Sequence, residues 1–317
     1  MPATPKRVDA ATLSSPAHDR GGRRKSTLER FLEGPWPLVL PALFMLALLQ
    51  GYPIVSQFYL AMTDLRIGAL GQSTFVGLEN FIALANSPRF LALFQYTFVF
   101  VFSVVALQFV VGLMLALLMD LPLKGRVVFR LGIVTSWVLS GVIVGYMWRL
   151  LLIESNFGVL NSLLQPLGIG PVRWLSSGGN AQLTLILVLV WKGAAWSMIF
   201  LLAGLQTISK EALESATIDG ASGWQKLLFI KLPLIKNVIL ISLIFSTISI
   251  FAAYDTIFVL TGGGPGGATE VVAVNMFLTA FGARGQLGMG AAIGVTLFLI
   301  ILVLVIAYLR FADRRPT

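Results

Sequence analysis

The sequence contains no cysteine, a single histidine and few charged residues. The absence of cysteine excludes a disulfide framework and thiol chemistry. Because His18 lies in a polar N-terminal segment, no histidine-based metal site is expected inside a membrane, and we predict no metal site. Charged residues make up 12% of the 317 residues, against roughly 25% in soluble domains. This scarcity of charge excludes an ordinary cytosolic protein.

Long apolar runs dominate the rest of the chain. Hydrophobic residues make up 57% of it, and its mean hydropathy is +0.87. A helix needs about 20 apolar residues to cross the hydrocarbon core, whereas a lipid-facing barrel strand alternates in polarity over about 10 residues. We therefore predict an all-α integral membrane protein with about six transmembrane helices. They are expected near residues 38–62, 93–118, 127–152, 181–205, 238–260 and 287–309.

The basic residues indicate an orientation. Of the 23 Lys and Arg residues, seventeen lie in the N-terminal segment, the C-terminal end and the links that follow spans two and four. The opposite loops contain only Arg66, Arg89, Arg173 and Arg284. The positive-inside rule then predicts a multi-pass protein of the bacterial cell membrane with both termini in the cytoplasm. The net charge of +9 does not indicate nucleic acid, because the basic residues are spread over four short segments beside membrane lipid.

The chain divides into two parts by composition. Residues 1–34 are rich in Ala, Ser, Pro, Arg and Lys, which predicts a disordered basic cytoplasmic tail. Residues 35–317 form one transmembrane domain whose outer loops are too short for a separate ectodomain. The pair Arg23-Arg24 resembles a twin-arginine export signal, but the apolar run after it is too long for a cleaved segment.

The cytoplasmic link 206–236, which we call the coupling loop, holds two short helical patterns. Ser209 can cap a first helix that runs to about Ala216, with Glu211 in its first turn. Gly220 supplies a sharp turn, and a second helix from about Ser222 is expected to end at Pro233. A helix-turn-helix with exposed apolar residues suits docking into a groove on a soluble partner. The alternative is a pair of interfacial helices on lipid headgroups.

The coupling loop resembles the EAA loop of membrane subunits of binding-protein-dependent ABC importers. The matching positions are Glu214, Ala216, Gly220, Ile230, Leu232 and Pro233, with Ser215 in place of the central alanine. Glu211 and Asp219 lie within the same stretch and are included in the predicted site. The runs WRLLLIESNFGVLNSLL from Trp148 and YDTIFVLTGGGPGGATE from Tyr254 resemble signatures of the carbohydrate-import permeases typified by maltose and glycerol-3-phosphate systems.

The resemblance implies a type I ABC importer permease fold and a channel-forming subunit that moves a sugar or related polar solute by alternating access. It implies a second, similar permease subunit, two cytoplasmic ATPase subunits and an extracytoplasmic solute-binding protein as partners. No nucleotide-binding motif occurs in the chain, so ATP and Mg are expected on the ATPase subunits, with no cofactor and no enzymatic activity in this chain. The glycine-rich run is expected to face the binding protein through Gly262, Gly263, Gly264 and Pro265.

Ionisable and aromatic residues in the spans are candidates for the solute path. Buried ionisable groups in a membrane usually face a cavity or a partner, and aromatic rings can stack on sugars while their polar tips donate hydrogen bonds. The candidates are Trp137, Tyr146, Trp191, Lys192, Trp196, Tyr254, Asp255 and Asn275. The alternatives are a structural ion pair or snorkelling side chain for Lys192 and Asp255, and helix packing or an interfacial belt for the aromatic residues.

Two other function classes compete with this interpretation. A secondary transporter driven by an ion gradient would use Lys192 and Asp255 as an ion or proton relay. An intramembrane enzyme would need a nucleophile with a base, and the spans contain neither His nor Cys nor a recognisable constellation of this kind.

Overall fold

The computed structural model describes residues 36–69 and 71–312, which are mainly helical. Strand-like pairing within them is limited to two isolated bridges, Thr63 with Phe75 and Arg66 with Gln286. The predicted tail, residues 1–34, lies outside the described residues. Inter-residue contacts separate a first unit that ends at Ile54 from a second that begins at Val55.

The first unit contains α2 (Trp36–Leu46), the π-helical turn η1 (Ala47–Gly51) and the start of α3 (Tyr52–Ala61). In η1 the Tyr52 N–H donates to the Ala47 carbonyl, five residues back. This wider winding directly precedes Pro53, whose ring lacks an N–H and would crowd a normal helical turn. Residues Pro37–Ala61 therefore form one continuous candidate span of 25 residues despite two prolines.

The second unit contains three more long apolar helices. They are α5 (Pro88–Asp120), α9 (Gly178–Leu205) and α16 (Leu287–Ala312). With Pro37–Ala61 they make four straight candidate spans in the described chain, and two bent helix pairs raise the number to six. The predictions for spans one, two, four and six are confirmed, and a short helix, α4 (Glu79–Ala85), precedes α5.

The third predicted span, 127–152, is wrong as a single helix. It consists of α6 (Arg126–Val138) and α7 (Gly141–Leu151), which are bent by 103°. Leu139 and Ser140 between them adopt extended backbone, and the Ser140 hydroxyl accepts a hydrogen bond from Ile143 N. Ser140 thus caps a new helix, which stabilises the break.

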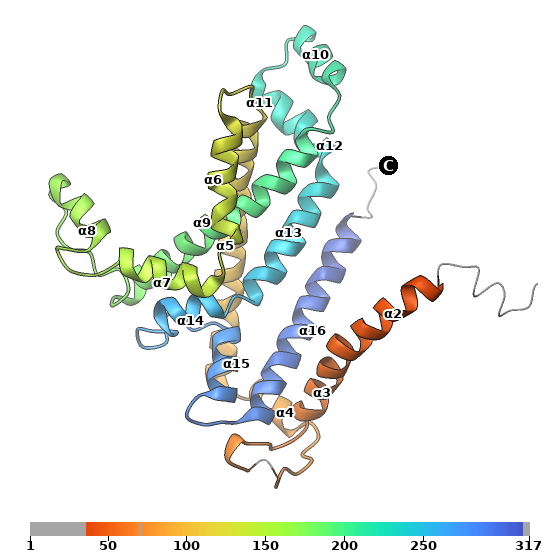
Figure 1. Cartoon of the computed structure of the whole chain (residues 1–317), viewed down its shortest axis with the longest axis vertical. Helices are drawn as coiled ribbons and strands as arrows, with labels where there is room; N and C mark the ends of the chain where they lie inside the picture. Colours follow the sequence, from red (N-terminus) through yellow and green to blue (C-terminus); the bar gives the residue numbers. More distant parts are fainter. Residues whose placement is uncertain (1–35, 70, 313–317) are drawn as a thin grey trace, which may run out of the picture. The chain divides into compact units, whose positions relative to one another are not determined.

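The fifth predicted span, 238–260, is also interrupted. Helix α13 (Lys236–Phe251) ends before residues 252–254, and α14 (Asp255–Thr261) starts in a new direction (Figure 1). The glycine-rich turn and a further short helix, α15 (Val272–Phe281), lead to α16. Between α9 and α13 lie α10 (Lys210–Ile218), α11 (Gly223–Lys226), the π-helical turn η4 (Leu227–Lys231) and α12 (Leu232–Leu234). The short helix α8 (Val159–Leu164) follows α7.

The central contact of this unit joins α5 to α9. Val101, Val104, Leu185 and Val188 are fully buried in it or nearly so. Gly112 allows the two backbones to approach closely, because a β-carbon at this position would lie 2.4 Å from Ser197 Cβ. Close packing over small residues is what holds helices together in lipid, where burial of apolar surface offers no net gain. The α5–α9 pair is therefore the packed centre of this unit, and other helices pack against it.

Candidate functional site

The coupling loop forms the predicted helix-turn-helix at one end of the second unit (Figure 1). The Ser209 hydroxyl accepts a hydrogen bond from Ala212 N and begins α10, with Glu211 in its first turn. Gly220 follows with a φ of +81°. Ala221 N donates to Ala216 O and Gly220 N to Thr217 O, which is the Schellman arrangement at a helix end. The turn requires Gly220 for its positive φ and not for lack of space, since a β-carbon there would meet no neighbour within 4 Å.

The second helix is held to the first. Ser222 and Gln225 form a reciprocal capping box at the start of α11. Lys226 Nζ donates to the Thr217 hydroxyl of α10 at 2.8 Å. The two helices and the turn therefore form one small structured unit rather than a flexible link.

The expectation that Pro233 ends this helix is wrong. The chain winds into η4, where Leu232 N donates to Leu227 O five residues back, and continues through Pro233 to Leu234. The wide turn accommodates the proline ring, as η1 does before Pro53. The helix ends at Ile235, where the direction changes by 74° into α13. Lys231 in η4 forms an ion pair with Asp120, the last residue of α5, at 3.5 Å.

The surface of the coupling loop combines charged residues of both signs with apolar residues. Glu211, Glu214, Asp219 and Pro233 are exposed, Ile230 and Leu232 are half-buried, and Ala216 is buried. The exposed apolar residues expected on this helix-turn-helix are present, although Ile218 and Phe229 were not among the predicted site residues. Ile218 is 87% exposed, Trp224 68% and Phe229 73%. Single exposed apolar residues are common on proteins, but three on one small protruding unit indicate an interaction surface.

Three predicted solute-path residues share one cavity. A pocket of about 200 Å³ between α6, α9 and α13 is lined by Trp137, Lys192 and Trp196. The Trp137 and Trp196 rings lie 5.0 Å apart between centroids. Polar groups that the prediction missed complete the lining, namely Gln108, Ser246, Ser249 and Thr256. The arrangement combines aromatic faces with hydrogen-bonding groups.

Gln108 fixes the shape of this pocket. It is 2% exposed and donates from Nε2 to Leu189 O at 2.9 Å. Gly193 makes room for it, because a β-carbon on Gly193 would lie 2.0 Å from Gln108 Nε2. An amide near the middle of the apolar run of span two, whose only other amide is Gln95 near its start, was the signal that could have identified this residue, since polar groups within a membrane span are usually functional.

The other candidates lie elsewhere. Trp191 packs edge-on against Trp148, with ring centroids 5.6 Å apart, and lines an apolar groove beside α6. Tyr146 is exposed on α7, and Tyr254 stacks on Phe277. Asp255 lies against Gly141 at the start of α7. Within residues 36–69 and 71–312, Lys192 and Asp255 form no ion pair with each other.

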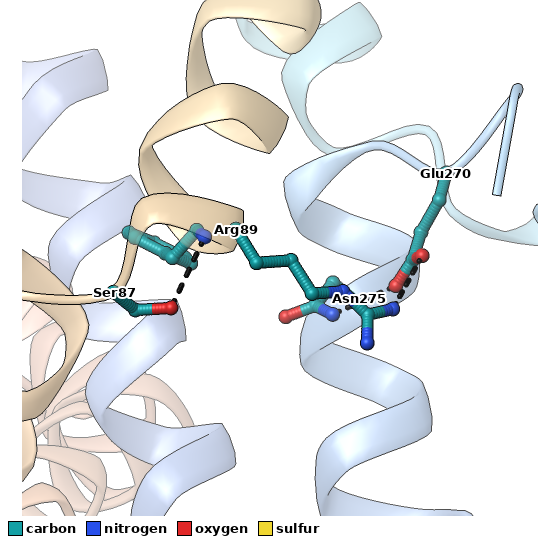
Figure 2. Close-up of polar contacts among 5 residues, drawn as sticks. Ser87, Arg89, Glu270 and Asn275 are labelled. Carbon is teal, nitrogen blue, oxygen red and sulfur yellow. Dashed lines mark hydrogen bonds and ion pairs between the residues drawn. The ribbon is translucent and has the colours of Figure 1, made fainter.

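Asn275 belongs to a separate polar cluster near the opposite end from the coupling loop. It donates from Nδ2 to Glu270 Oε1 at 2.7 Å, and Arg89 reaches from α5 to Glu270 Oε2 at 3.2 Å (Figure 2). The cluster borders a second cavity of about 490 Å³. In the glycine-rich turn, Gly262 is exposed, Gly264 and Pro265 are half-buried, and Gly263 is buried.

Comparison with known proteins identifies relatives along most of the chain. The family described as "Binding-protein-dependent transport system inner membrane component" matches residues 85–315. The trehalose/maltose transport system permease protein MalF of Thermococcus litoralis is 34% identical over 273 residues, which cover 86% of this chain and 91% of that protein. The arabinooligosaccharides transport system permease protein AraP of Bacillus subtilis is 30% identical over 87% of this chain and 88% of that protein.

A solved structure has the same fold. A chain in the structure of a bacterial ABC transporter involved in the import of the acidic polysaccharide alginate superposes with a TM-score of 0.78. It is 22% identical, and the superposition covers 92% of this chain and 100% of that one. The predicted ABC importer permease fold is therefore confirmed.

Proposed function

Because the chain belongs to the family of binding-protein-dependent transport system inner membrane components, of which it is a multi-pass permease, we propose that it carries a sugar or related polar solute into the cytoplasm by alternating access. The relatives named for trehalose and maltose and for arabinooligosaccharides support a carbohydrate. Family membership favours ATP-driven import over the ion-gradient alternative. In this proposal the chain binds no cofactor and catalyses no reaction.

The observation that carries the proposal is the coupling loop. Ile218, Trp224 and Phe229 are exposed on a unit whose two helices are fixed by Gly220, a capping box and the Lys226–Thr217 hydrogen bond. A rigid apolar surface can transmit a displacement that a flexible link would absorb. We assign its partner as an ATPase subunit, with Glu214 at a polar part of the contact.

The ion pair between Lys231 and Asp120 connects a displacement of the coupling loop to the membrane spans. It joins η4 to the end of α5, and α5 packs along α9. The pocket with Trp137, Lys192 and Trp196 is lined by the same α9. A movement of the coupling loop can thus reach this pocket through contiguous packed elements.

The partners in this proposal are a second permease, two ATPases and an external binding protein. The pocket of about 200 Å³ that this chain lines is smaller than an ordinary small-molecule site of roughly 300–1,000 Å³, which suits a solute path completed by a second permease. The exposed Gly262 and its neighbours in the glycine-rich turn are assigned to the binding protein. Both termini are placed in the cytoplasm by the positive-inside rule.

Uptake in sealed vesicles tests the proposed function. The complex that copurifies with the chain is reconstituted, and labelled maltose, trehalose and arabinooligosaccharides are supplied with the binding protein. We expect uptake of at least one sugar that requires ATP on the coupling-loop side and persists in the presence of an ionophore. Uptake that survives ATP depletion and stops with the ionophore would contradict ATP-driven import.

A further inference from the structure

The 490 Å³ cavity at the end opposite the coupling loop lies between α4, the first turns of α5 and α16, and α15. Its polar lining includes Ser87, Arg89, Glu270, Asn275, Arg284 and Gln286, together with Thr279. Phe90, Leu93, Met289 and Ile293 supply an apolar wall on the deeper side. The cavity therefore brings Arg284 and Gln286 before α16, Arg89 of α5, and Glu270 and Asn275 beside the start of α15 together with apolar side chains of α5 and α16.

The polar lining favours an anion. Glu270, with 11% of its side chain exposed, is paired with Arg89 and accepts from Asn275, so its charge is neutralised within the cluster (Figure 2). Arg89 uses one guanidinium nitrogen for this contact, and 72% of its side chain stays exposed. Arg284 is exposed and has no acidic partner among the described residues. Two guanidinium groups against one carboxylate leave the lining with a net positive charge.

An apolar groove continues on the next turns of the same two helices. Phe94 and Phe98 of α5 form one wall, and Thr296, Leu299, Ile300, Val303 and Leu304 of α16 form the other. The groove has a volume of about 380 Å³. The Thr296 hydroxyl donates to Ala292 O, so it offers the groove no unpaired donor. Val303 is 65% exposed and Leu299 46%.

The two cavities together match the dimensions of one membrane leaflet. From Met289 to Val303, α16 advances about 21 Å at 1.5 Å per residue, and one leaflet with its headgroup region is about 20–22 Å thick. A polar pocket with net positive charge at the interface, followed by an apolar groove of this depth, has the shape and polarity of a single lipid molecule.

We propose that the α5–α16 groove is a specific site for an anionic diacylphospholipid of the leaflet on the side away from the coupling loop. The phosphodiester lies between Arg89 and Arg284, because guanidinium groups bind phosphate oxygens through paired charge-assisted hydrogen bonds. One acyl chain lies along Phe94, Phe98 and Ile300. A transported sugar has no apolar portion that would fill this groove. A zwitterionic lipid has no net negative charge, so two arginines bind its headgroup less tightly than that of an anionic lipid. The proposal rests on membrane residence and not on the transport function.

Native mass spectrometry of the delipidated full-length chain tests the site. Dioleoyl phosphatidylglycerol and dioleoyl phosphatidylcholine carry the same acyl chains, and we expect tighter binding of the anionic lipid. Arg284→Gln, at an exposed position that the fold does not need, should lower the preference for phosphatidylglycerol about fivefold. Adding Arg89→Gln should abolish the preference, whereas Arg89→Lys retains the charge and should keep part of it. Ile300→Trp should fill the groove and weaken binding of both lipids.

The matched control is Arg173→Gln, which removes the same charge from an exposed outer-loop residue away from the cavity, and it should leave lipid binding unchanged. Equal binding of the two lipids by the wild-type chain would overturn the proposal. Unchanged preference in Arg284→Gln and in the double variant would do the same. If Ile300→Trp prevents assembly with another subunit while lipid binding is unaffected, the groove belongs to a protein helix instead.

Discussion

Lys231 Nζ in η4 lies 3.5 Å from Asp120 Oδ2 at the last residue of α5, so one ion pair joins the coupling loop to a membrane span. The side chains are 21% and 30% exposed, which leaves the pair partly shielded from solvent. Asp120→Asn should therefore weaken the link between the loop and α5. We expect lower transport per ATP hydrolysed, with the complex still assembled.

Exchanging the two charges distinguishes a role of this ion pair in coupling from a local effect on folding. Asp120→Lys and Lys231→Asp should each impair coupling, and the double variant should recover part of it because opposite charges face each other again. In a double-mutant cycle on thermal unfolding we expect a coupling free energy of about 1 kcal/mol. Strictly additive effects on both stability and transport would mean that the pair has no role.

Gly193 should tolerate no side chain. A methyl group there would collide with the amide of Gln108, which is buried and hydrogen-bonded to Leu189 O. Gly193→Ala should displace this amide at a cost of roughly 1–3 kcal/mol for a buried donor left unpaired, and should reduce uptake. Gly132→Ala is the matched control, because no atom lies within 4 Å of a β-carbon there. Equal thermal stability and uptake of the two variants would exclude a packing role for Gly193.

Glu154, in the loop after α7, should make stability depend on pH. Burial raises the pKa of its carboxyl, but hydrogen bonds from the Ser176 hydroxyl and from Leu175 N and Ser176 N outweigh burial and lower the pKa below its ordinary value. A depressed pKa means that the ionised carboxylate stabilises the fold above its unfolded pKa, and that this stabilisation is lost as pH falls through the folded pKa.

The Glu154→Gln variant should accordingly lose stability at neutral pH and depend less on pH in the acidic range. Thermal unfolding followed from neutral to acidic pH measures both effects. Glu79→Gln serves as a control, since Glu79 is an exposed carboxylate of α4. Parallel pH profiles for wild type and Glu154→Gln would show that this network does not contribute.

The proposed orientation can be measured by thiol labelling, because the chain has no native cysteine. Ser73 and Ser162 are exposed in outer segments, and Ser222 is exposed in the coupling loop. Single cysteines at Ser73 and Ser162 should react with an impermeant reagent added to intact cells, while a cysteine at Ser222 should react only after lysis. Labelling of Ser222 from outside would reverse the orientation.

The long helices could be predicted from hydrophobicity because lipid selects for continuous apolar runs, as in Pro88–Asp120 and Gly178–Leu205. The breaks after Val138 and Phe251 were not predicted, because both lie within long hydrophobic stretches, although Asp255 in the first turn of α14 was a local signal of the second. At the first break Ser140 followed by Gly141 was the local signal, a cap inside an apolar run. Pro233 misled the prediction because a π-helical turn accommodates its ring.

The candidate site divides in the same way. The helix-turn-helix around Gly220 was predictable because its caps and turn are local in sequence. The meeting of Gln108 with Lys192 and Trp196 depends on how α5 packs against α9, which residue spacing does not specify. Asn275 lies apart from this pocket and donates a hydrogen bond to Glu270, and residue spacing does not specify this placement either.

The central claim is that the coupling loop transmits ATPase closure to the spans, and Gly220 offers the most selective change. Gly220→Val forces a β-branched residue to a φ of +81°, which costs roughly 1–3 kcal/mol and should misplace α11 with its exposed Trp224. Glu214→Lys reverses a charge on the same surface. The control Gly223→Ala adds a methyl group with no neighbour within 4 Å and without positive φ.

The decisive measurement is ATPase stimulation by solute-loaded binding protein in reconstituted complexes of the four chains, wild type, Gly220→Val, Glu214→Lys and Gly223→Ala. We predict that wild type and Gly223→Ala are stimulated equally, whereas Gly220→Val and Glu214→Lys insert normally but lose stimulation or release the ATPase subunits. Stimulation and uptake at the wild-type level in both Gly220→Val and Glu214→Lys would contradict coupling through this loop.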